Sequence, residues 1–310
     1  MNKTVKIAVI GVGKLGARHA QVYSKIQGVE LVGVCDLIEH RAKDVASHCK
    51  TRAFKDYRDL LNIVDAASIV VPAHDHYLIS KDFLESGVHL LIEKPITTDL
   101  AHADELLAIA KKKDLIIQVG HIERFNSAIR TIKGIINAPR FIECHRLGPY
   151  NPHFADVGVT LDLMIHDLDI VLDLVKSSIR SVDAVGAYIL SKTEDISNAR
   201  IRFDNNAVCD LTASRVTADV VRKIRIFQDN AYISIDYVTQ EAQIYTRDNG
   251  HIHHKKIDIT KSDSLKEELL DFVDCVRHHK RPLVSGEEGR AALALALQIS
   301  GQIQNEQKRN

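Results

Sequence analysis

The first 36 residues constrain the fold most strongly, because an apolar strand, three spaced glycines, a helix and an acid-terminated strand follow one another. Residues 4–10, "TVKIAVI", form an apolar run of strand length, and Gly11-Val12-Gly13-Lys14-Leu15-Gly16 comes directly after it. A helical pattern and a second strand, "VELVGVC", follow, and Asp36 lies 20 residues beyond Gly16. This order and spacing predict a dinucleotide-binding strand–helix–strand unit.

Each key residue of this unit has a physical role. Gly11 permits a tight turn, Gly13 lets a pyrophosphate approach the backbone, and Gly16 lets the helix pack closely on the strand. The free amides at the helix start attract the negative charge of the pyrophosphate. Asp36 would accept hydrogen bonds from ribose hydroxyls and repel a 2′-phosphate, which favours NAD over NADP. Arg41 is a contrary sign, because a nearby arginine can bind that phosphate.

The alternation of strands and helices continues to residue 119. "AASIVVP", "VHLLIEKP" and "LIIQVG" have strand character, while "YLISKDFLESG" and "LAHADELLAIAKKK" have helical patterns. Such alternation predicts right-handed crossovers and a doubly wound parallel sheet. Ligands of these sheets bind at the carboxyl ends of the strands, where the glycine segment, "VVPAHDH" and "IEKP" are expected.

Glu93-Lys94-Pro95 follows the buried type of strand at 88–92. Charged residues at the carboxyl end of an interior strand point toward the ligand crevice, where Lys94 could donate to a substrate oxygen. A surface ion pair in a loop explains the same residues equally well.

Residues 161–174, "LDLMIHDLDIVLDL", predict a buried helix with one narrow polar stripe. Asp162, His166, Asp169 and Asp173 are spaced by four, three and four residues, so they share one helix face. Nearly all other positions are apolar, which is typical of a buried helix. Buried charges are costly unless paired, so a satisfied ion-pair stripe is the alternative to a catalytic role.

Composition limits the class of protein. Lys+Arg and Asp+Glu both number 41, which argues against a nucleic-acid partner or an anionic membrane surface. No signal peptide and no membrane-spanning apolar run is apparent, so we expect a cytoplasmic protein. The five cysteines form no disulfide framework. The histidines of "HIHH" (251–254) and "CVRHH" (275–279) are expected at an exposed strand end and a polar helix end.

The second half has a different pattern. Beyond residue 179 come strand-like runs with few helices, separated by turn signals at 204–206 and 229–230, and two helices close the chain. Ile224, Ile226, Ile233 and Ile235 alternate with polar residues, as in a sheet with one face covered by helices. We therefore expect the second half to form a meander of strands with helices on one face of the sheet.

The whole chain resembles the Gfo/Idh/MocA oxidoreductases. The glycine segment, Asp36, Pro72-x3-His76, Glu93-Lys94-Pro95 and Asp162-x3-His166 lie in the order and spacing of that family. The closing segment "RPLVSGEEGRAALALALQI" is also similar. The resemblance implies a Rossmann domain at 1–119. At 120–310 it implies an α+β substrate and oligomerisation domain with a large open antiparallel sheet. A last helix at about 286–308 would pack back on the first domain.

The resemblance also implies roles for individual residues. His166 would be the general acid or base on a substrate hydroxyl, Lys94 would stabilise charge on the reacting oxygen, and Asp162 would bind substrate or orient His166. Asp169 and Asp173 are expected to be structural. No metal is expected, and NAD is the expected cofactor. The expected cofactor-binding residues are Gly11, Val12, Gly13, Lys14, Leu15, Gly16, Asp36, Leu37, Arg41, Pro72, His76, Glu93 and Lys94.

The substrate is expected to be a sugar or nucleotide sugar. Segments 121–126 and 146–158 resemble the branch of the family that oxidises the 3-hydroxyl of UDP-N-acetylglucosamine. Arg124, Arg146 and Tyr150 are the expected substrate groups, although the two arginines could equally form interdomain salt bridges. A free sugar or inositol is the alternative substrate, and a non-catalytic dinucleotide-binding regulator is the alternative function. A homodimer or homotetramer is expected by analogy.

Overall fold

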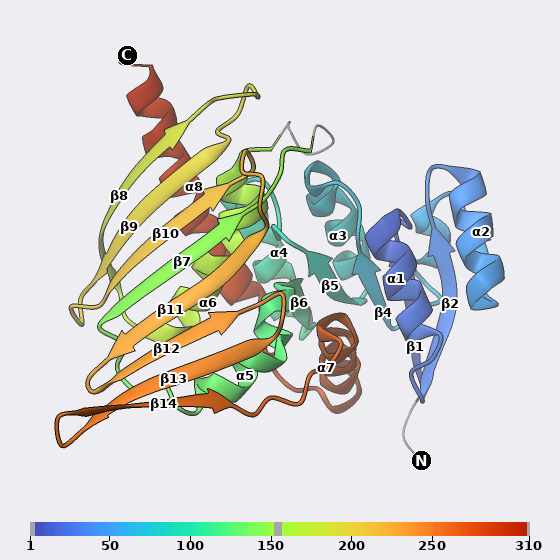
Figure 1. Ribbon diagram of the computed structural model, residues 1–310. Coiled ribbons are helices and arrows are strands. Elements are labelled where there is room, and N and C mark those ends of the chain that lie inside the picture. Colours follow the sequence, from blue (N-terminus) through green and yellow to red (C-terminus); the bar gives the residue numbers. More distant parts are fainter. Residues whose placement is uncertain (1–3, 152–156, 309–310) are drawn as a thin grey trace. The chain divides into compact units, whose positions relative to one another are not determined.

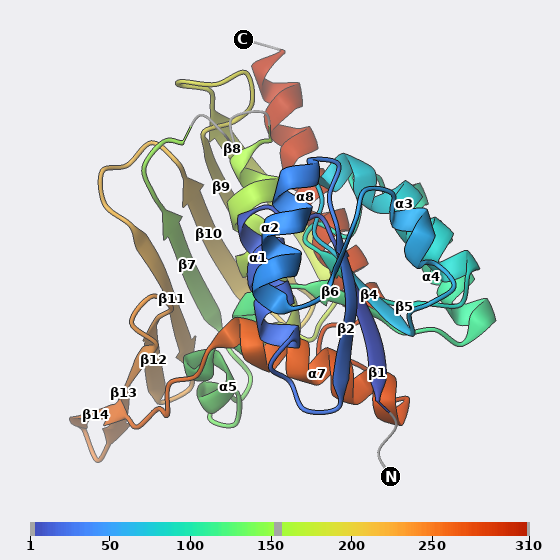
Figure 2. The same ribbon diagram turned by 90° about the vertical axis from the view of Figure 1, so that its right-hand side faces the viewer.

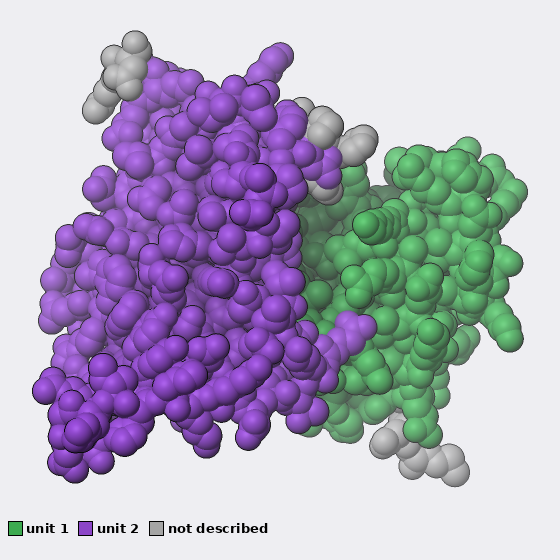
Figure 3. Space-filling model, viewed as in Figure 1, with its two compact units in different colours: residues 1–122, 264–290 green, residues 123–263, 291–310 purple. Residues whose placement is uncertain are grey.

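The computed structural model describes residues 4–151 and 157–308. The chain forms two compact units, which Figure 3 distinguishes by colour. Unit 1 contains residues 1–122 and 264–290, and unit 2 contains residues 123–263 and 291–310. The division between the last two segments falls within helix α8 (Gly286–Gln307).

Unit 1 contains a six-stranded sheet in the order β3-β2-β1-β4-β5-β6, with all paired strands parallel (Figure 1). This order confirms the predicted doubly wound sheet. Its strands are β1 (Val5–Ile10), β2 (Val29–Cys35), β3 (Arg52–Phe54), β4 (Ala66–Ile69), β5 (His89–Glu93) and β6 (Ile117–Gly120). Its helices are α1 (Lys14–Tyr23), α2 (Glu39–Cys49), α3 (His76–Glu85), α4 (Leu100–Lys113) and α7 (Ser264–His278), with short 3₁₀ turns at Tyr57–Leu60 and Ala73–Asp75.

The central strand β1 is buried on both faces. Ile7, Ala8 and Val9 are fully buried, as expected for a strand covered by helices above and below. Helix α7 comes from the end of the chain, yet its Leu269 and Phe272 pack in the same apolar cluster as Ile7 and Val9. A segment distant in sequence thus completes the core of the unit.

Unit 2 contains an eight-stranded sheet in the order β14-β13-β12-β11-β7-β10-β9-β8. All paired strands are antiparallel except β7 and β10, which are parallel. Strand β7, which lies near the middle of the sheet, is not among the strands predicted from the sequence. The strands are β7 (Phe141–Leu147), β8 (Ile179–Ala187), β9 (Ile196–Phe203), β10 (Val208–Ser214), β11 (Val221–Gln228), β12 (Ala231–Asp236), β13 (Glu241–Asp248) and β14 (His251–Ile257).

Helices cover one face of this sheet, as the alternation of residues predicted (Figure 2). Side chains of α5 (Ser127–Lys133), α6 (Ile165–Val175) and the later part of α8 share an apolar cluster with alternate residues of the strands. On the other face, Phe227, Tyr232, Tyr245 and His254 form a row of stacked rings across four strands, with centroids 4.8, 5.3 and 4.5 Å apart.

The expected helix at 161–174 is present but is not regular. Thr160–Met164 form a π-helical turn, and the α-helix begins only at Ile165. Asp162 therefore lies in the π turn and His166 in the α-helix, which changes their relative direction from that of an ideal helix. Such π turns occur frequently at functional sites. Among the described helices, none has the length and apolar character needed to cross a bilayer.

Candidate functional site

The glycine loop has the geometry that its sequence predicts. Gly11 has a φ of +83°, and a Cβ there would lie 2.5 Å from the carbonyl oxygen of Val70. A Cβ on Gly16 would collide with the carbonyl oxygen of Gly11, so Gly16 permits the close packing of α1 on the loop. A Cβ on Gly13 would meet no atom within 4 Å. The open space beside Gly13, at the start of α1, suits the approach of a pyrophosphate.

Asp36 lies directly beside this loop. Its Oδ2 accepts a hydrogen bond from the Val12 amide at 2.9 Å, and its Oδ1 accepts one from the Ile38 amide at 2.8 Å. A carboxylate has about four acceptor positions, so two remain for ribose hydroxyls. Leu37 is 83% exposed, and Arg41 is exposed on α2. The loop, the acid and the helix start together form a site with the donors and acceptors that a dinucleotide requires.

His76 connects two loops at the carboxyl edge of the sheet. Its Nδ1 lies 2.8 Å from the Pro95 carbonyl oxygen and its Nε2 lies 2.9 Å from the Val71 carbonyl oxygen. The ring is buried, and burial lowers the pKa of His76. Pro72 precedes the 3₁₀ turn that leads to His76. A neutral imidazole donates from one ring nitrogen only, so one of these two contacts at a time is a hydrogen bond. His76 still connects the loops that carry Val71 and Pro95, and its contact with a cofactor stays a prediction.

Glu93 and Lys94 differ in their surroundings. Glu93 is buried, where its Oε1 lies 3.3 Å from His19 Nε2 and its Oε2 accepts from the Lys94 amide at 3.2 Å. A Cβ on Gly120 would lie 2.8 Å from the Glu93 carboxyl carbon, so this glycine makes room for the carboxyl group. Lys94 is half-buried. Glu93 is therefore an interior group that anchors the strand end, and it does not belong to a surface ion pair.

A buried acid that the sequence analysis missed completes this region. Glu268 of α7 is fully buried, and its ligand atoms and those of His19 and Glu93 all lie within 4.8 Å of one another. One divalent ion could reach all three groups; the expectation of no metal stays a prediction. Burial raises the pKa of Glu268 well above its ordinary value, and the nearby Glu93 and Asp271 raise it further. No local pattern connects Glu268 with the distant strand end.

The raised pKa of Glu268 predicts a dependence of stability on pH. The folded state retains a proton that the unfolded state releases above the ordinary pKa, so Glu268 increasingly destabilises the protein as pH rises from about 4.5. Through Glu268, the free energy of unfolding should fall by up to about 1.4 kcal/mol per pH unit. We expect this fall to be absent in Glu268→Gln. Its melting temperature should exceed that of the wild type by more at pH 9 than at pH 6. Glu267→Gln, on the same helix, is the control, and an equal difference at both pH values would contradict the prediction.

In unit 2 the acids of the α6 segment separate into two groups. Asp169 and Asp173 form ion pairs with Arg124 at 3.3 and 3.2 Å, and Asp173 also binds Lys133 at 2.7 Å. These contacts confirm the structural role expected for both acids. Asp162 and His166, by contrast, are half-buried. Asp162 borders a cavity of about 220 Å³ that lies entirely within unit 2.

Arg146 lies in a buried ion-pair network. Its Nε and Nη2 donate to Asp167 at 2.8 and 2.9 Å, and its Nη1 donates to Glu123 at 3.0 Å. Burial raises the pKa of Asp167, although Arg146 opposes that rise. Asp167 is a charged residue of the 161–174 segment that lies outside the four-residue polar stripe, and the spacing within that segment does not predict its partner Arg146. The hydroxyl group of Tyr150 accepts a hydrogen bond from Ser191 Oγ at 3.3 Å.

The two predicted substrate arginines, Arg124 and Arg146, thus already contact carboxylates of their own unit. This arrangement matches the salt-bridge alternative more closely than the substrate role, except that the bridges lie within unit 2. Their contact with a substrate stays a prediction.

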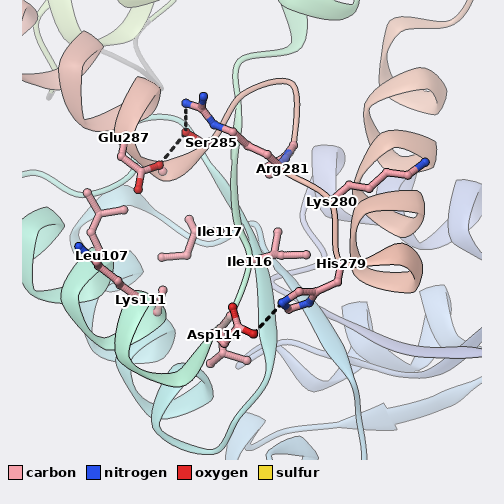
Figure 4. A pocket seen from close by; sticks show the side chains of 14 residues that line it. Leu107, Lys111, Asp114, Ile116, Ile117, His279, Lys280, Arg281, Ser285 and Glu287 are labelled. Atoms are coloured by element: carbon pink, nitrogen blue, oxygen red, sulfur yellow. Dashed lines mark hydrogen bonds and ion pairs between the residues drawn. The ribbon is translucent and has the colours of Figure 1, made fainter.

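A larger hollow of about 500 Å³ lies on unit 1, and Figure 4 shows side chains that line it. None of the lining residues belongs to the glycine loop. Asp114 and His279 point toward each other there with a 2.9 Å ion pair, and Arg281 and Glu287 both reach Ser285. Ile116 and Ile117 place the hollow at the amino end of β6. Ligands of parallel sheets bind at the opposite, carboxyl edge, so this hollow is not the cofactor site.

Comparison with protein families agrees with this geometry. Residues 5–121 match a family model described as an oxidoreductase family with an NAD-binding Rossmann fold. Residues 129–234 match the model of the GFO/IDH/MocA C-terminal domain.

Individual relatives extend the match over the chain. UDP-N-acetylglucosamine 3-dehydrogenase of Acidithiobacillus ferrooxidans is 38% identical over 95% of this chain and 96% of its own length. Its structure covers 96% of this chain and 97% of its own, with a TM-score of 0.92. Myo-inositol 2-dehydrogenase of Thermotoga maritima is 26% identical over 94% of both chains. The fold of scyllo-inositol dehydrogenase from Lactobacillus casei, at 21% identity, matches 98% of both chains with a TM-score of 0.84.

Proposed function

The chain belongs to the Gfo/Idh/MocA family of oxidoreductases, and from that premise we propose that it oxidises the 3-hydroxyl of UDP-N-acetylglucosamine with NAD. The observation that supports this substrate is the 38% identity to a UDP-N-acetylglucosamine 3-dehydrogenase over 95% of this chain. The inositol dehydrogenases are less similar, at 26% identity for the Thermotoga maritima enzyme. A neutral polyol is therefore the second candidate substrate.

The dinucleotide would bind along the glycine loop. The amides at the start of α1 and the open side of Gly13 suit the pyrophosphate, and the remaining acceptor positions of Asp36 suit the adenosine ribose. Lys14, Leu15 and Leu37 are exposed around the same loop. When bound, NAD supplies the acceptor for the hydride.

The chain's own residues would manage the proton and the developing charge. In the proposal, His166 removes the proton of the reacting hydroxyl, and Lys94 donates a hydrogen bond to the same oxygen as negative charge develops on it. Asp162, in the turn before His166, accepts hydrogen bonds from neighbouring substrate hydroxyls or orients the imidazole. Arg124 and Arg146 bind carboxylates of α6 and so position the helix that carries His166, while Tyr150 contacts the substrate.

This function is tested by measuring the formation of NADH through its absorbance. We expect turnover with UDP-N-acetylglucosamine and much slower reaction with N-acetylglucosamine, glucose or inositol. Turnover of inositol alone would support the second candidate. Binding of NAD without turnover of any of these compounds would instead support a regulatory protein on the same fold.

Asp36 is proposed to favour NAD over NADP by charge. Asp36→Asn retains an oxygen that can accept from the Val12 amide but removes the charge that repels a 2′-phosphate. We expect the ratio of kcat/KM for NADP to that for NAD to rise at least about tenfold, equivalent to about 1.4 kcal/mol. Asp44→Asn, exposed on α2, is the control. An unchanged ratio would assign the preference to other residues.

Self-association is part of the proposal. The stacked rings on the uncovered face of the unit 2 sheet provide an apolar and aromatic surface that a second copy could cover. Light scattering during gel filtration measures the mass, and a homodimer or homotetramer is expected. A monomer at micromolar concentration would contradict the proposed self-association.

The expected cytoplasmic location stays a prediction.

A further inference from the structure

The cavity of about 220 Å³ in unit 2 brings together three arginines and Asp162. Whole pockets for small molecules usually measure about 300–1,000 Å³, so this cavity accommodates one part of a nucleotide sugar. Its walls come from the end of β7, the start of β11, the residue after β10 and the π turn before α6. One of its lining residues, Asp162, precedes His166 by one helical turn in the chain.

Two of the three arginines already bind carboxylates of unit 2. Arg146 binds Asp167 and Glu123 through three hydrogen bonds. Arg215 donates to Asp195 at 2.7 Å and to the Val157 carbonyl oxygen at 2.6 Å. Their charges are compensated by these carboxylates, so neither is well placed to bind an external anion.

Arg222 is the exception. It is exposed on β11, directly opposite Arg146 on β7 in the strand register, and it borders the cavity. Its guanidinium forms no hydrogen bond or ion pair with any residue that the structure describes, although its charge acts on the buried Asp167. A guanidinium has five donors in a geometry that matches phosphate oxygens.

The cavity thus presents different chemistry on its different walls. Arg222 offers positive charge and several donors, while the Asp162 carboxylate offers acceptors suited to sugar hydroxyls. A neutral polyol would use only the second wall. A phosphorylated sugar would use both, with its phosphate at Arg222 and its ring beside Asp162.

We propose that Arg222 binds the phosphate of the substrate and so selects a nucleoside diphosphate sugar over a neutral sugar or polyol. The inference rests on the proposed function, since it concerns the substrate of the same reaction. Arg222 is a specificity residue in this scheme and takes no part in the proton or hydride transfer.

The test compares Arg222→Ala with Lys223→Ala. Lys223 is the adjacent exposed residue of β11, and alternation along the strand places it on the other face of the sheet. For UDP-N-acetylglucosamine we expect Arg222→Ala to raise KM about 10- to 100-fold, the effect of losing a charged hydrogen bond. In Arg222→Ala, the kcat and the KM for NAD should stay near those of the wild type. The control Lys223→Ala should leave the kcat and both KM values near those of the wild type.

Arg222→Lys should recover part of the affinity, and the low activity with N-acetylglucosamine should not depend on residue 222. A KM for the nucleotide sugar within twofold of the wild type in Arg222→Ala would overturn the proposal.

Thermal stabilisation by UDP separates this inference from the proposed function, because it needs no turnover. If the wild type fails to oxidise UDP-sugars but is stabilised by UDP, and Arg222→Ala is not, the proposed reaction fails while the phosphate site stands. If UDP stabilises both proteins equally, or neither, the phosphate site is overturned. Inorganic phosphate is included as a probe, because stabilisation by phosphate alone at equal concentration would contradict selection for the nucleotide sugar.

Discussion

Replacing His166 by alanine is expected to reduce kcat for the sugar nucleotide by about 10³-fold, within the range observed when a general acid or base is lost. The side chain lies half-buried on the first turn of α6, which is fixed by the ion pairs of Asp169 and Asp173 farther along the helix. Alanine retains the helix and removes only the imidazole, so the fold and the affinity for NAD should be unchanged. Steady-state rates and the fluorescence of bound NADH measure the two quantities separately.

His145→Ala provides the matched control for His166→Ala. His145 lies in the same unit on β7, where alternating burial places it on the opposite face of the sheet from Arg146. Its Nε2 lies 3.5 Å from Glu143 Oε1. The control should keep kcat within about twofold of the wild type. A turnover in His166→Ala within tenfold of the wild type would remove His166 from the proton transfer, and lost NADH binding in that variant would indicate a structural role.

The cofactor half of the site could be predicted from local sequence because its chemistry is local. Gly11, Gly13, Gly16 and Asp36 act through backbone conformation, close approach and helix-start amides, and all of these follow from spacing within one strand–helix–strand unit. The alternation of apolar runs likewise predicted the parallel sheet, since each strand is buried by the helices adjacent to it in sequence. Of the strands in this parallel sheet, only the short edge strand β3 was not predicted, because three residues give little periodic signal.

The partners of the buried charges could not be predicted in the same way. Glu268 reaches the Glu93 and His19 region from a helix that is far along the chain, and Arg146 finds Asp167 only after β7 and α6 have packed together. Such pairs depend on tertiary packing, which no helical or strand period encodes. The spacing of residues 161–174 also assumed a regular α-helix, and the π turn at Thr160–Met164 departs from that assumption.

The largest effect on stability is expected at Arg146. Arg146→Met should lower the free energy of unfolding by about 3–5 kcal/mol, the usual result of removing one partner of a buried ion pair. Asp167 and Glu123 are 2% and 9% exposed, so the substitution leaves two interior carboxylates without the guanidinium that compensates them. Since the total stability of a domain is about 5–15 kcal/mol, the melting temperature should fall by on the order of 10 °C.

Arg225→Met is the comparison that isolates burial. Arg225 lies on the neighbouring strand β11 and binds Glu143 at 3.0 Å, but its side chain is 43% exposed. Solvent screens such pairs, so its loss should cost less than about 1 kcal/mol. Adding Asp167→Leu to Arg146→Met should recover part of the stability, because the double variant no longer buries that unpaired carboxylate. A melting temperature for Arg146→Met equal to that of Arg225→Met, together with a raised KM for the nucleotide sugar, would instead assign Arg146 to the substrate and contradict its structural role.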